Sequence, residues 1–232
     1  LGLAALMITL GFVLVGVLLA RQTRRLAPGY GDAYRFMETM QFAQAVPVLE
    51  RAVASGRVTP DLLMLLTSAY AYTGHIAKAQ ATADRAVHMF PQDASAYVSL
   101  ANGYRVQASY DEAARALQTA AKLSPEQAIV WAELGFVYLM ASDDAAAFDA
   151  FQTAAKFPRP AMYRVRVAYH LARFYRQNGD EEQAHTYEAQ MLASQAGLAV
   201  WQAMQQSLEG TLYGTSLRYE IEAIQNALHN AK

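Results

Sequence analysis

One pattern of side chains recurs along this chain at an interval of 34 residues, and it limits the possible folds more than any single motif does. The recurrence is clearest between segments 94–127 and 128–161. The matched positions are Tyr97 and Trp131, Leu100 and Leu134, Ala101 and Gly135, Tyr104 and Tyr138, Ala113 and Ala147, Leu117 and Phe151, and Ala120 and Ala154. A fixed period of roughly 20–50 residues is the signature of stacked repeats, each packing on its neighbours. The sequence therefore predicts an array of similar units.

The same frame extends to both sides of these two segments. The predicted units are 26–59, 60–93, 94–127, 128–161 and 165–198. The first unit is a degenerate copy that we expect to cap the array, because Gly29 and Asp32 stand where apolar residues are expected. Three residues around Pro158–Pro160 separate the fourth unit from the fifth, and the fifth carries Glu188 at a position that is large and apolar in earlier units.

Residues 199–232 lie beyond the repeat frame, and we expect them to form C-terminal capping helices. Segment 216–230 places Leu217, Ile221 and Ile224 on one helix face, together with Leu228, as an amphipathic helix does. Such a helix closes the open end of a repeat stack, since the last unit has no neighbour to cover it. The alternative is that this helix docks onto a partner.

The fullest unit reads WAELGFVYL over 131–139, with Ala147, Phe151 and Ala154 after it. In this pattern the chain resembles the tetratricopeptide repeat family over roughly residues 26–198. The resemblance implies an all-α solenoid of about five helical hairpins, in which large side chains of the first helix fill a groove and small ones allow close approach. It also implies that the first helix of each unit lines a concave surface on which proteins bind.

Mapped onto this chain, the outward positions of those first helices are the candidate partner-binding residues. They are Tyr34, Met64, Tyr72, Asn102, Arg105, Phe136, Leu139, Met140, Tyr169, Arg173 and Arg176. The fourth unit contributes the apolar members Phe136, Leu139 and Met140, and exposed apolar patches tend to be contact sites. The alternative is that the turn at 158–160 or the C-terminal helix buries them.

The fifth unit gathers arginines along one helix face. Arg166, Arg173 and Arg176 share this face, with Arg164 close by. Guanidinium groups in such a cluster suit carboxylates or lipid phosphates. The alternative is a solvated basic face that the acidic residues over 180–182 balance.

The first twenty residues predict a transmembrane helix. They contain no charge, and twenty helical residues span roughly the 30 Å of a bilayer core. The anchor residues of this prediction are Leu1, Leu10, Phe12, Gly16 and Ala20. A secretory signal peptide is the competing interpretation, but Leu18 and Ala20 match its small-residue cleavage site poorly.

Residues 21–29 form a predicted basic juxtamembrane linker. Its residues Arg21, Arg24 and Arg25 favour the cytoplasmic side for the rest of the chain. The single-span tetratricopeptide proteins that the chain resembles favour the periplasmic side instead. The predicted location is therefore a bacterial inner membrane, with the side of the repeat domain left open.

Composition excludes several classes of function. The formal net charge of −1 gives no field that attracts nucleic acid, and the absence of cysteine excludes thiolate chemistry and cysteine-ligated metals. The five histidines show no metal-binding spacing, and the nearest approach to one is the pair Glu182 and His185. We therefore expect no catalysis, cofactor, metal or small-molecule substrate.

These observations predict a membrane-anchored scaffold or assembly factor. Its expected partners are proteins, as subunits of a larger membrane complex to which the chain belongs or is accessory. The alternative is a chaperone-like receptor that captures unfolded or peptide ligands in the apolar part of the groove. Copurification separates the two, because a scaffold returns one stoichiometric partner set and a receptor returns a mixed one.

Overall fold

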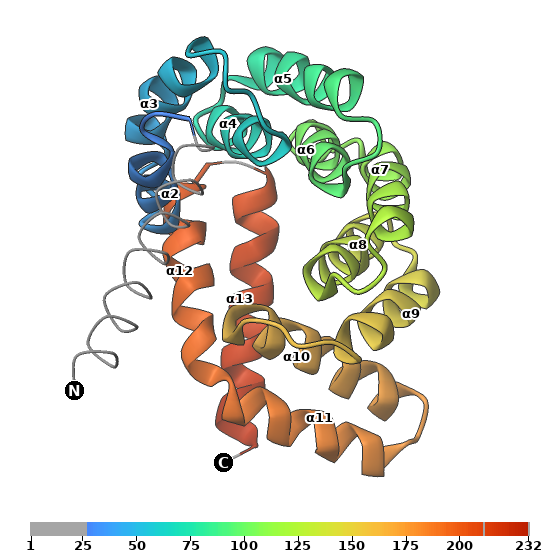
Figure 1. The fold of residues 1–232 in the computed structure, drawn as a ribbon. Coiled ribbons are helices and arrows are strands. Elements are labelled where there is room, and N and C mark those ends of the chain that lie inside the picture. The colour runs from blue at the N-terminus through green and yellow to red at the C-terminus, as the bar shows by residue number, and fades with distance from the viewer. Residues whose placement is uncertain (1–26, 211, 232) are drawn as a thin grey trace, which may run out of the picture.

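The computed structural model describes residues 27–210 and 212–231, and these residues form an array of helices (Figure 1). The helices are α2 (Tyr30–Glu38), α3 (Phe42–Ala54), α4 (Pro60–Tyr72), α5 (Ile76–Met89), α6 (Ala94–Arg105), α7 (Tyr110–Leu123), α8 (Ala128–Met140), α9 (Asp144–Ala155), α10 (Ala161–Gln177), α11 (Glu181–Ala193), α12 (Leu198–Ser207) and α13 (Leu212–Asn230). A short 3-10 helix, Gln195–Gly197, precedes α12. Within the described ranges the fold is all-α.

In five successive helix pairs, from α2–α3 to α10–α11, the same type of turn joins the first helix to the second. One residue in each turn has left-handed backbone dihedrals, and these residues are Met40, Gly74, Ala108, Ser142 and Gly179, with φ of 58°, 78°, 57°, 62° and 79°. The N–H of the following residue bonds to the carbonyl five positions before it, for example Ser109 to Tyr104 at 3.0 Å. This is the Schellman motif, which satisfies carbonyls at a helix end. The turns therefore recur at the interval of the sequence pattern, lengthened by three residues before the last.

Small residues let the two helices of a pair approach closely. Ala79, Ala83 and Ala86 on α5 are fully buried. A Cβ atom added to Gly135 on α8 would lie 2.5 Å from the Phe151 ring of α9, which is too close for any larger residue without movement of that ring. The two helices of a pair are therefore closely packed at the small residues of the sequence pattern.

The helix pairs follow an arc (Figure 1). Helices α3, α5, α7 and α9 lie on its outer side, and α4, α6, α8 and α10 line its inner side. Helix α12 runs back along this inner side toward α4, and α13 returns from there, so that the C-terminal end of α13 lies near α11 (Figure 1). Their apolar side chains join a core cluster that also includes Tyr72 of α4 and Val165 of α10.

Two predictions about the membrane are corrected. Among residues 27–210 and 212–231, none of the helices is sufficiently long and apolar to traverse a bilayer. The longest, α13, has 19 residues and includes Arg218 and Glu220, whereas a spanning helix needs about 20 mostly apolar residues. A transmembrane element of the fold and a location in a bacterial inner membrane are therefore not supported. The predicted anchor, residues 1–20, and residues 21–26 of the linker lie outside the described residues.

Candidate protein-binding face

The surface formed by α4, α6, α8 and α10 is called the inner face below, and α12 with α13 is called the C-terminal helix pair. The apolar stripe of α13 faces inward, with Leu217 and Ile224 fully buried and Ile221 and Leu228 nearly so. From α12, Trp201 is buried, and its indole N–H donates to the carbonyl of Met162 at the start of α10, 2.7 Å away. The inner face is therefore covered in part by the chain's own C-terminal segment.

A buried ion pair joins α10 to α13. Arg166 is fully buried, and its Nε and Nη2 donate to the two carboxylate oxygens of Glu220 at 2.8 and 2.6 Å. The guanidinium carbon lies 3.7 Å from the ring centroid of Phe136 and 3.9 Å from that of Trp201. Two parallel hydrogen bonds to one carboxylate add strength and a fixed geometry, and the aromatic rings beside the cation add cation–π attraction. This contact fixes α13 against α8 and α10.

His170 completes this site. Its Nε2 lies 2.9 Å from Oε1 of Glu220, and its ring stacks on Phe151 with centroids 5.1 Å apart. Burial lowers the pKa of His170, although the hydrogen bond with Glu220 acts in the opposite direction. Burial by itself would raise the pKa of Glu220, but Arg166 and the bond with His170 outweigh it and hold the pKa well below its usual range. Glu220 is therefore ionised beside a neutral His170.

A second buried arginine lies on α6. Arg105 donates through Nη1 to Glu133 of α8 at 2.8 Å, and through Nη2 to the hydroxyl of Tyr72 at 3.2 Å and to Oδ1 of Asn102 at 3.0 Å. The ring of Tyr213 lies 4.7 Å from its guanidinium carbon. Burial raises the pKa of Tyr72 to about 12, with Arg105 opposing the rise. The Tyr72 hydroxyl therefore stays protonated at neutral pH.

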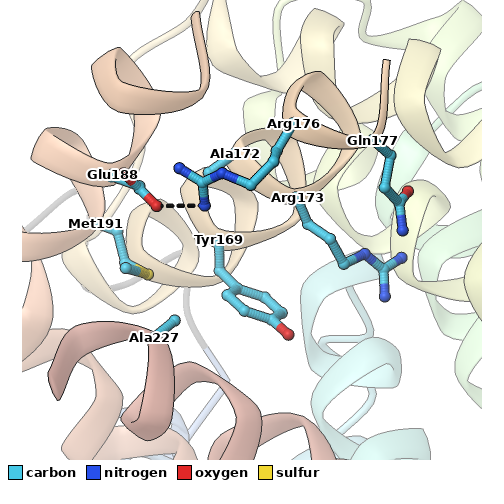
Figure 2. A pocket seen from close by; sticks show the side chains of 8 residues that line it. All are labelled: Tyr169, Ala172, Arg173, Arg176, Gln177, Glu188, Met191 and Ala227. Atoms are coloured by element: carbon cyan, nitrogen blue, oxygen red, sulfur yellow. Dashed lines mark hydrogen bonds and ion pairs between the residues drawn. The ribbon is translucent and has the colours of Figure 1, made fainter. Parts of the chain in front are cut away.

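Two of the cavities beside the C-terminal helix pair are lined by arginines of the inner face. One, of about 250 Å³, is lined by α4, α6 and the end of α12, including Tyr72, Arg105 and Leu208. The other, of about 190 Å³, lies between α10, α11 and α13 and is called the α10–α11 pocket below. It is lined by Tyr169, Ala172, Arg173, Arg176, Gln177, Glu188, Met191 and Ala227 (Figure 2).

The arginines of the α10–α11 pocket differ in their partners. Arg176 donates to Glu188 at 2.6 Å and to Glu181 at 3.3 Å. Figure 2 shows Arg176 turned toward Glu188, whereas the guanidinium of Arg173 points to the other side of the pocket. Within the described part of the chain, Arg173 has no carboxylate within ion-pair distance, and its Nε is buried without a hydrogen-bond partner.

Comparison with known proteins agrees with this architecture. Residues 98–164 match the sequence model of the tetratricopeptide repeat. The match covers less than half of the chain, and together with the architecture it supports a tetratricopeptide-type helical repeat fold. Proteins with this fold generally mediate contacts between proteins and are generally scaffolds rather than enzymes. No curated protein matches the sequence.

Three solved structures show how much of the chain shares this fold. A thermophilic tetratricopeptide repeat protein of Thermus thermophilus is 18% identical, with 78% of this chain and 97% of that chain covered and a TM-score of 0.62. MamA is 20% identical, with 72% of this chain and 96% of that chain covered and a TM-score of 0.54. A chain of the APC/C hetero-tetramer Cut9–Hcn1 is 13% identical, with 86% of this chain and 44% of that chain covered and a TM-score of 0.54. At these identities the likeness is one of fold.

The structure places the predicted binding residues of the tetratricopeptide repeats in different environments. Phe136 and Arg105 are buried, and Tyr34 and Arg176 are exposed. The half-buried members are Met64, Tyr72, Asn102, Leu139, Met140, Tyr169 and Arg173. One group, Tyr72, Asn102 and Arg105, meets in the hydrogen-bond network around Arg105. A second group, Tyr169, Arg173 and Arg176, lines the α10–α11 pocket, and the others belong to neither group.

The structure also locates the predicted apolar patch of the fourth unit and the predicted arginine cluster of the fifth unit. The apolar patch is not open, because Phe136 is 4% exposed and lies under Arg166 and Trp201. The arginines of the fifth unit do not form one basic face. Arg166 is buried against Glu220, whereas Arg176 is exposed and paired with Glu188.

Several residues that form part of this face were not identified from the sequence. Glu220, Trp201 and Tyr213 come from the C-terminal segment, where the repeat frame gives no guide to position. One signal was present, because Glu220 follows Leu217 by three residues and precedes Ile224 by four, which puts a carboxylate on the apolar stripe of α13. A carboxylate in such a stripe indicates a buried cationic partner.

Proposed function

We propose that the chain is a scaffold that holds protein partners on its inner face and its C-terminal helix pair. The observation that carries this proposal is that the inner face already binds an amphipathic helix, α13, through a stripe of apolar side chains and one glutamate. Recognition of an amphipathic helix in a groove is a common mode of binding between proteins. The face is thus chemically suited to partners with helical, partly acidic surfaces.

Exposed residues beside this face and on the C-terminal helix pair supply further contact residues. Tyr34 on α2 is 47% exposed, and Tyr219 on the outer side of α13 is 61% exposed. Tyrosine and arginine carry much of the binding energy in protein interfaces, because both combine apolar area with hydrogen bonding. With Arg173 and Arg176 in the α10–α11 pocket, these residues form the surface we assign to partners.

A scaffold fits the structure better than a receptor for unfolded chains. Such a receptor needs an open apolar groove, and the apolar residue Phe136 lies beneath α12 instead. The remaining surface combines tyrosines with ion pairs, and such a surface selects partners by geometry and charge. We therefore propose a defined partner set rather than broad capture.

Affinity capture with the full chain tests this function. We expect wild-type protein to retain a small set of proteins at fixed stoichiometry, and the double variant Tyr34→Glu/Arg173→Glu to lose it. Arg85→Glu, an exposed change on the outer helix α5, is the matched control and should retain the set. Circular dichroism checks that helicity is equal in all three proteins. Retention of the same proteins by the double variant, or a mixed set that differs between preparations, would contradict the proposal.

A further inference from the structure

Among the described residues, each buried arginine of the inner face is paired with a carboxylate. The α10–α11 pocket, in contrast, has more cationic than anionic side chains. Arg105 has Glu133 and Arg166 has Glu220, both at 2.8 Å or less. Among the residues that line the pocket, Arg173 and Arg176 are cationic and Glu188 is the one anion. Arg176 already occupies Glu188, so the lining carries a net positive charge centred on Arg173.

Arg173 is oriented to receive an acceptor. Its Nε is buried without a hydrogen-bond partner, and the ring of Phe174 lies beside its guanidinium, with the centroid 5.0 Å from the guanidinium carbon. Figure 2 shows the polar ends of Tyr169, Arg173 and Gln177 on the same side of the pocket, away from Glu188. All three groups can donate hydrogen bonds, and a carboxylate accepts several at once. A buried donor without an acceptor is costly, so binding an acceptor there is favourable.

The rest of the lining decides what kind of anion fits. Ala172, Met191 and Ala227 are apolar and come from α10, α11 and α13. A volume of about 190 Å³ is smaller than the roughly 300 Å³ at which pockets for drug-sized ligands begin, so it suits one side chain. A glutamate side chain combines two methylene groups for the apolar wall with a carboxylate for Arg173. A phosphate has no apolar part to place there.

We propose that the α10–α11 pocket binds the side-chain carboxylate of a glutamate on a protein partner, with Arg173 as its counter-ion and Tyr169 and Gln177 as further donors. This inference rests on the proposed function, because the glutamate belongs to a protein held by the scaffold. It gives that partner a chemistry, namely an acidic residue on a helix or loop that enters between α11 and α13.

Butyrate and butyramide test the pocket without a known partner. Butyrate reproduces a glutamate side chain cut at Cα, and butyramide is its uncharged counterpart. In the ¹⁵N-labelled full chain, we expect butyrate to move the Nε–Hε resonance of Arg173 saturably, with a Kd on the order of 10 mM for a few charge-assisted hydrogen bonds. Butyramide, and sodium chloride at the same ionic strength, should produce no saturable shift, which excludes simple screening.

Two variants assign the effect. In Arg173→Gln, butyrate should no longer produce saturable shifts at Tyr169 and Gln177, whereas Arg164→Gln, an exposed change on the same helix, should bind as the wild type does. Equal shifts with butyramide, no saturable shift with butyrate, or unaltered binding by Arg173→Gln would each overturn the pocket assignment. If the wild-type chain captures a defined partner set that the Tyr34→Glu/Arg173→Glu variant loses, but butyrate does not bind, this inference alone is overturned and the proposed function stands. Butyrate binding without any captured partner would overturn the proposed function instead.

Discussion

Arg105 and Arg166 are both buried on the inner face, but different parts of the chain hold them. Arg105 of α6 pairs with Glu133 of α8, which is the next inner helix of the repeat array. Arg166 of α10 pairs with Glu220 of α13, a helix outside the repeats. The repeats therefore neutralise Arg105 by themselves, whereas Arg166 depends on the C-terminal helix pair. One site belongs to the array, and the other attaches α13 to it.

The Arg166 site also sets the position of α13 along the inner face. Apolar contacts alone tolerate a shift of a helix by one turn, about 5.4 Å, because the next apolar residue takes the vacated place. Such a shift would separate Glu220 from Arg166 and leave a buried charge without a partner, which costs several kcal/mol, about 3–5. The pair therefore specifies one register. At the Arg105 site the C-terminal contact is the ring of Tyr213, which imposes a weaker constraint.

The largest effect we predict is that of Glu220→Gln. The change keeps the size of the side chain but leaves Arg166 as an uncompensated buried cation, and we expect a loss of about 3–5 kcal/mol in the free energy of unfolding. Urea unfolding followed by circular dichroism at pH 7 measures it. Glu222→Gln, an exposed change on the same helix, is the control and should cost less than about 0.5 kcal/mol.

A double variant separates the ion pair from general disruption of the site. Arg166→Met/Glu220→Met removes both charges, and we expect it to be more stable than either single methionine variant, because no buried charge remains unpaired. Additive losses in this double-mutant cycle would show that the two side chains do not act as a pair.

A smaller effect is expected for Glu133→Gln at the Arg105 site. This change weakens one bond from Arg105 and one from Tyr163, whose hydroxyl lies 2.7 Å from the carboxylate. Arg105 keeps its bonds to Tyr72 and Asn102 and its contact with Tyr213. We expect a loss of about 1.5–3 kcal/mol, the range for hydrogen bonds that involve a charged group. Measured under the same conditions, a loss equal to or above that of Glu220→Gln would reverse the distinction between the sites.

Trypsin digestion sharpens the same comparison without relying on global stability. If Glu220 attaches α13, Glu220→Gln should make the bonds after Arg218 and Arg166 more accessible, and Glu133→Gln should not, since its loss lies within the repeats. The reason is that cleavage reports the local opening of a segment. Mass spectrometry of the first fragments identifies which bond is cut.

The repeat array could be predicted from the sequence because its contacts are local. Each helix packs on its neighbours within about one period, so the recurrence of small and large residues carries most of the information. The turns show where residue type no longer predicts the local backbone conformation. Gly74 and Gly179 indicate a left-handed residue, but Met40, Ala108 and Ser142 hold the same conformation without a residue type that favours it. There the position within the repeat decides, because the Schellman bonds compensate the strained residue.

The placement of the C-terminal helix pair could not be predicted in this way. Arg166 and Glu220 are 54 positions apart, and nothing in the 34-residue pattern relates them. The prediction of an outward groove treated Phe136 and Arg105 as accessible, and both are buried. Tyr169, Arg173 and Arg176, also chosen from the repeat frame, do meet in one pocket, because residues three and four apart on one helix share a face.

The smallest effect concerns pH and distinguishes the two arginine sites by their titratable neighbours. His170 faces Glu220 of α13, Phe136 of α8 and Phe151 of α9, with Arg166 and Arg173 on its own helix. Its pKa is lowered by burial, so below about pH 6.5 the unfolded chain binds a proton that the folded chain does not. Stability from this group is complete above that pH and falls as pH decreases toward the folded pKa, by at most about 1.4 kcal/mol per pH unit.

His170→Gln should remove this dependence while keeping a donor for Glu220. We expect its free energy of unfolding to change less than that of the wild type between pH 7.5 and 5, while His88→Gln, an exposed change, follows the wild type. Glu220 contributes separately and only in stronger acid, because its stabilisation is complete above the usual carboxyl range and is lost as pH falls through that range toward its lowered pKa. The Arg105 site has no such group, since Tyr72, with a pKa of about 12, titrates only in alkali. Equal pH profiles for wild type and His170→Gln would show that folding does not change the pKa of His170, and would contradict the lowered pKa.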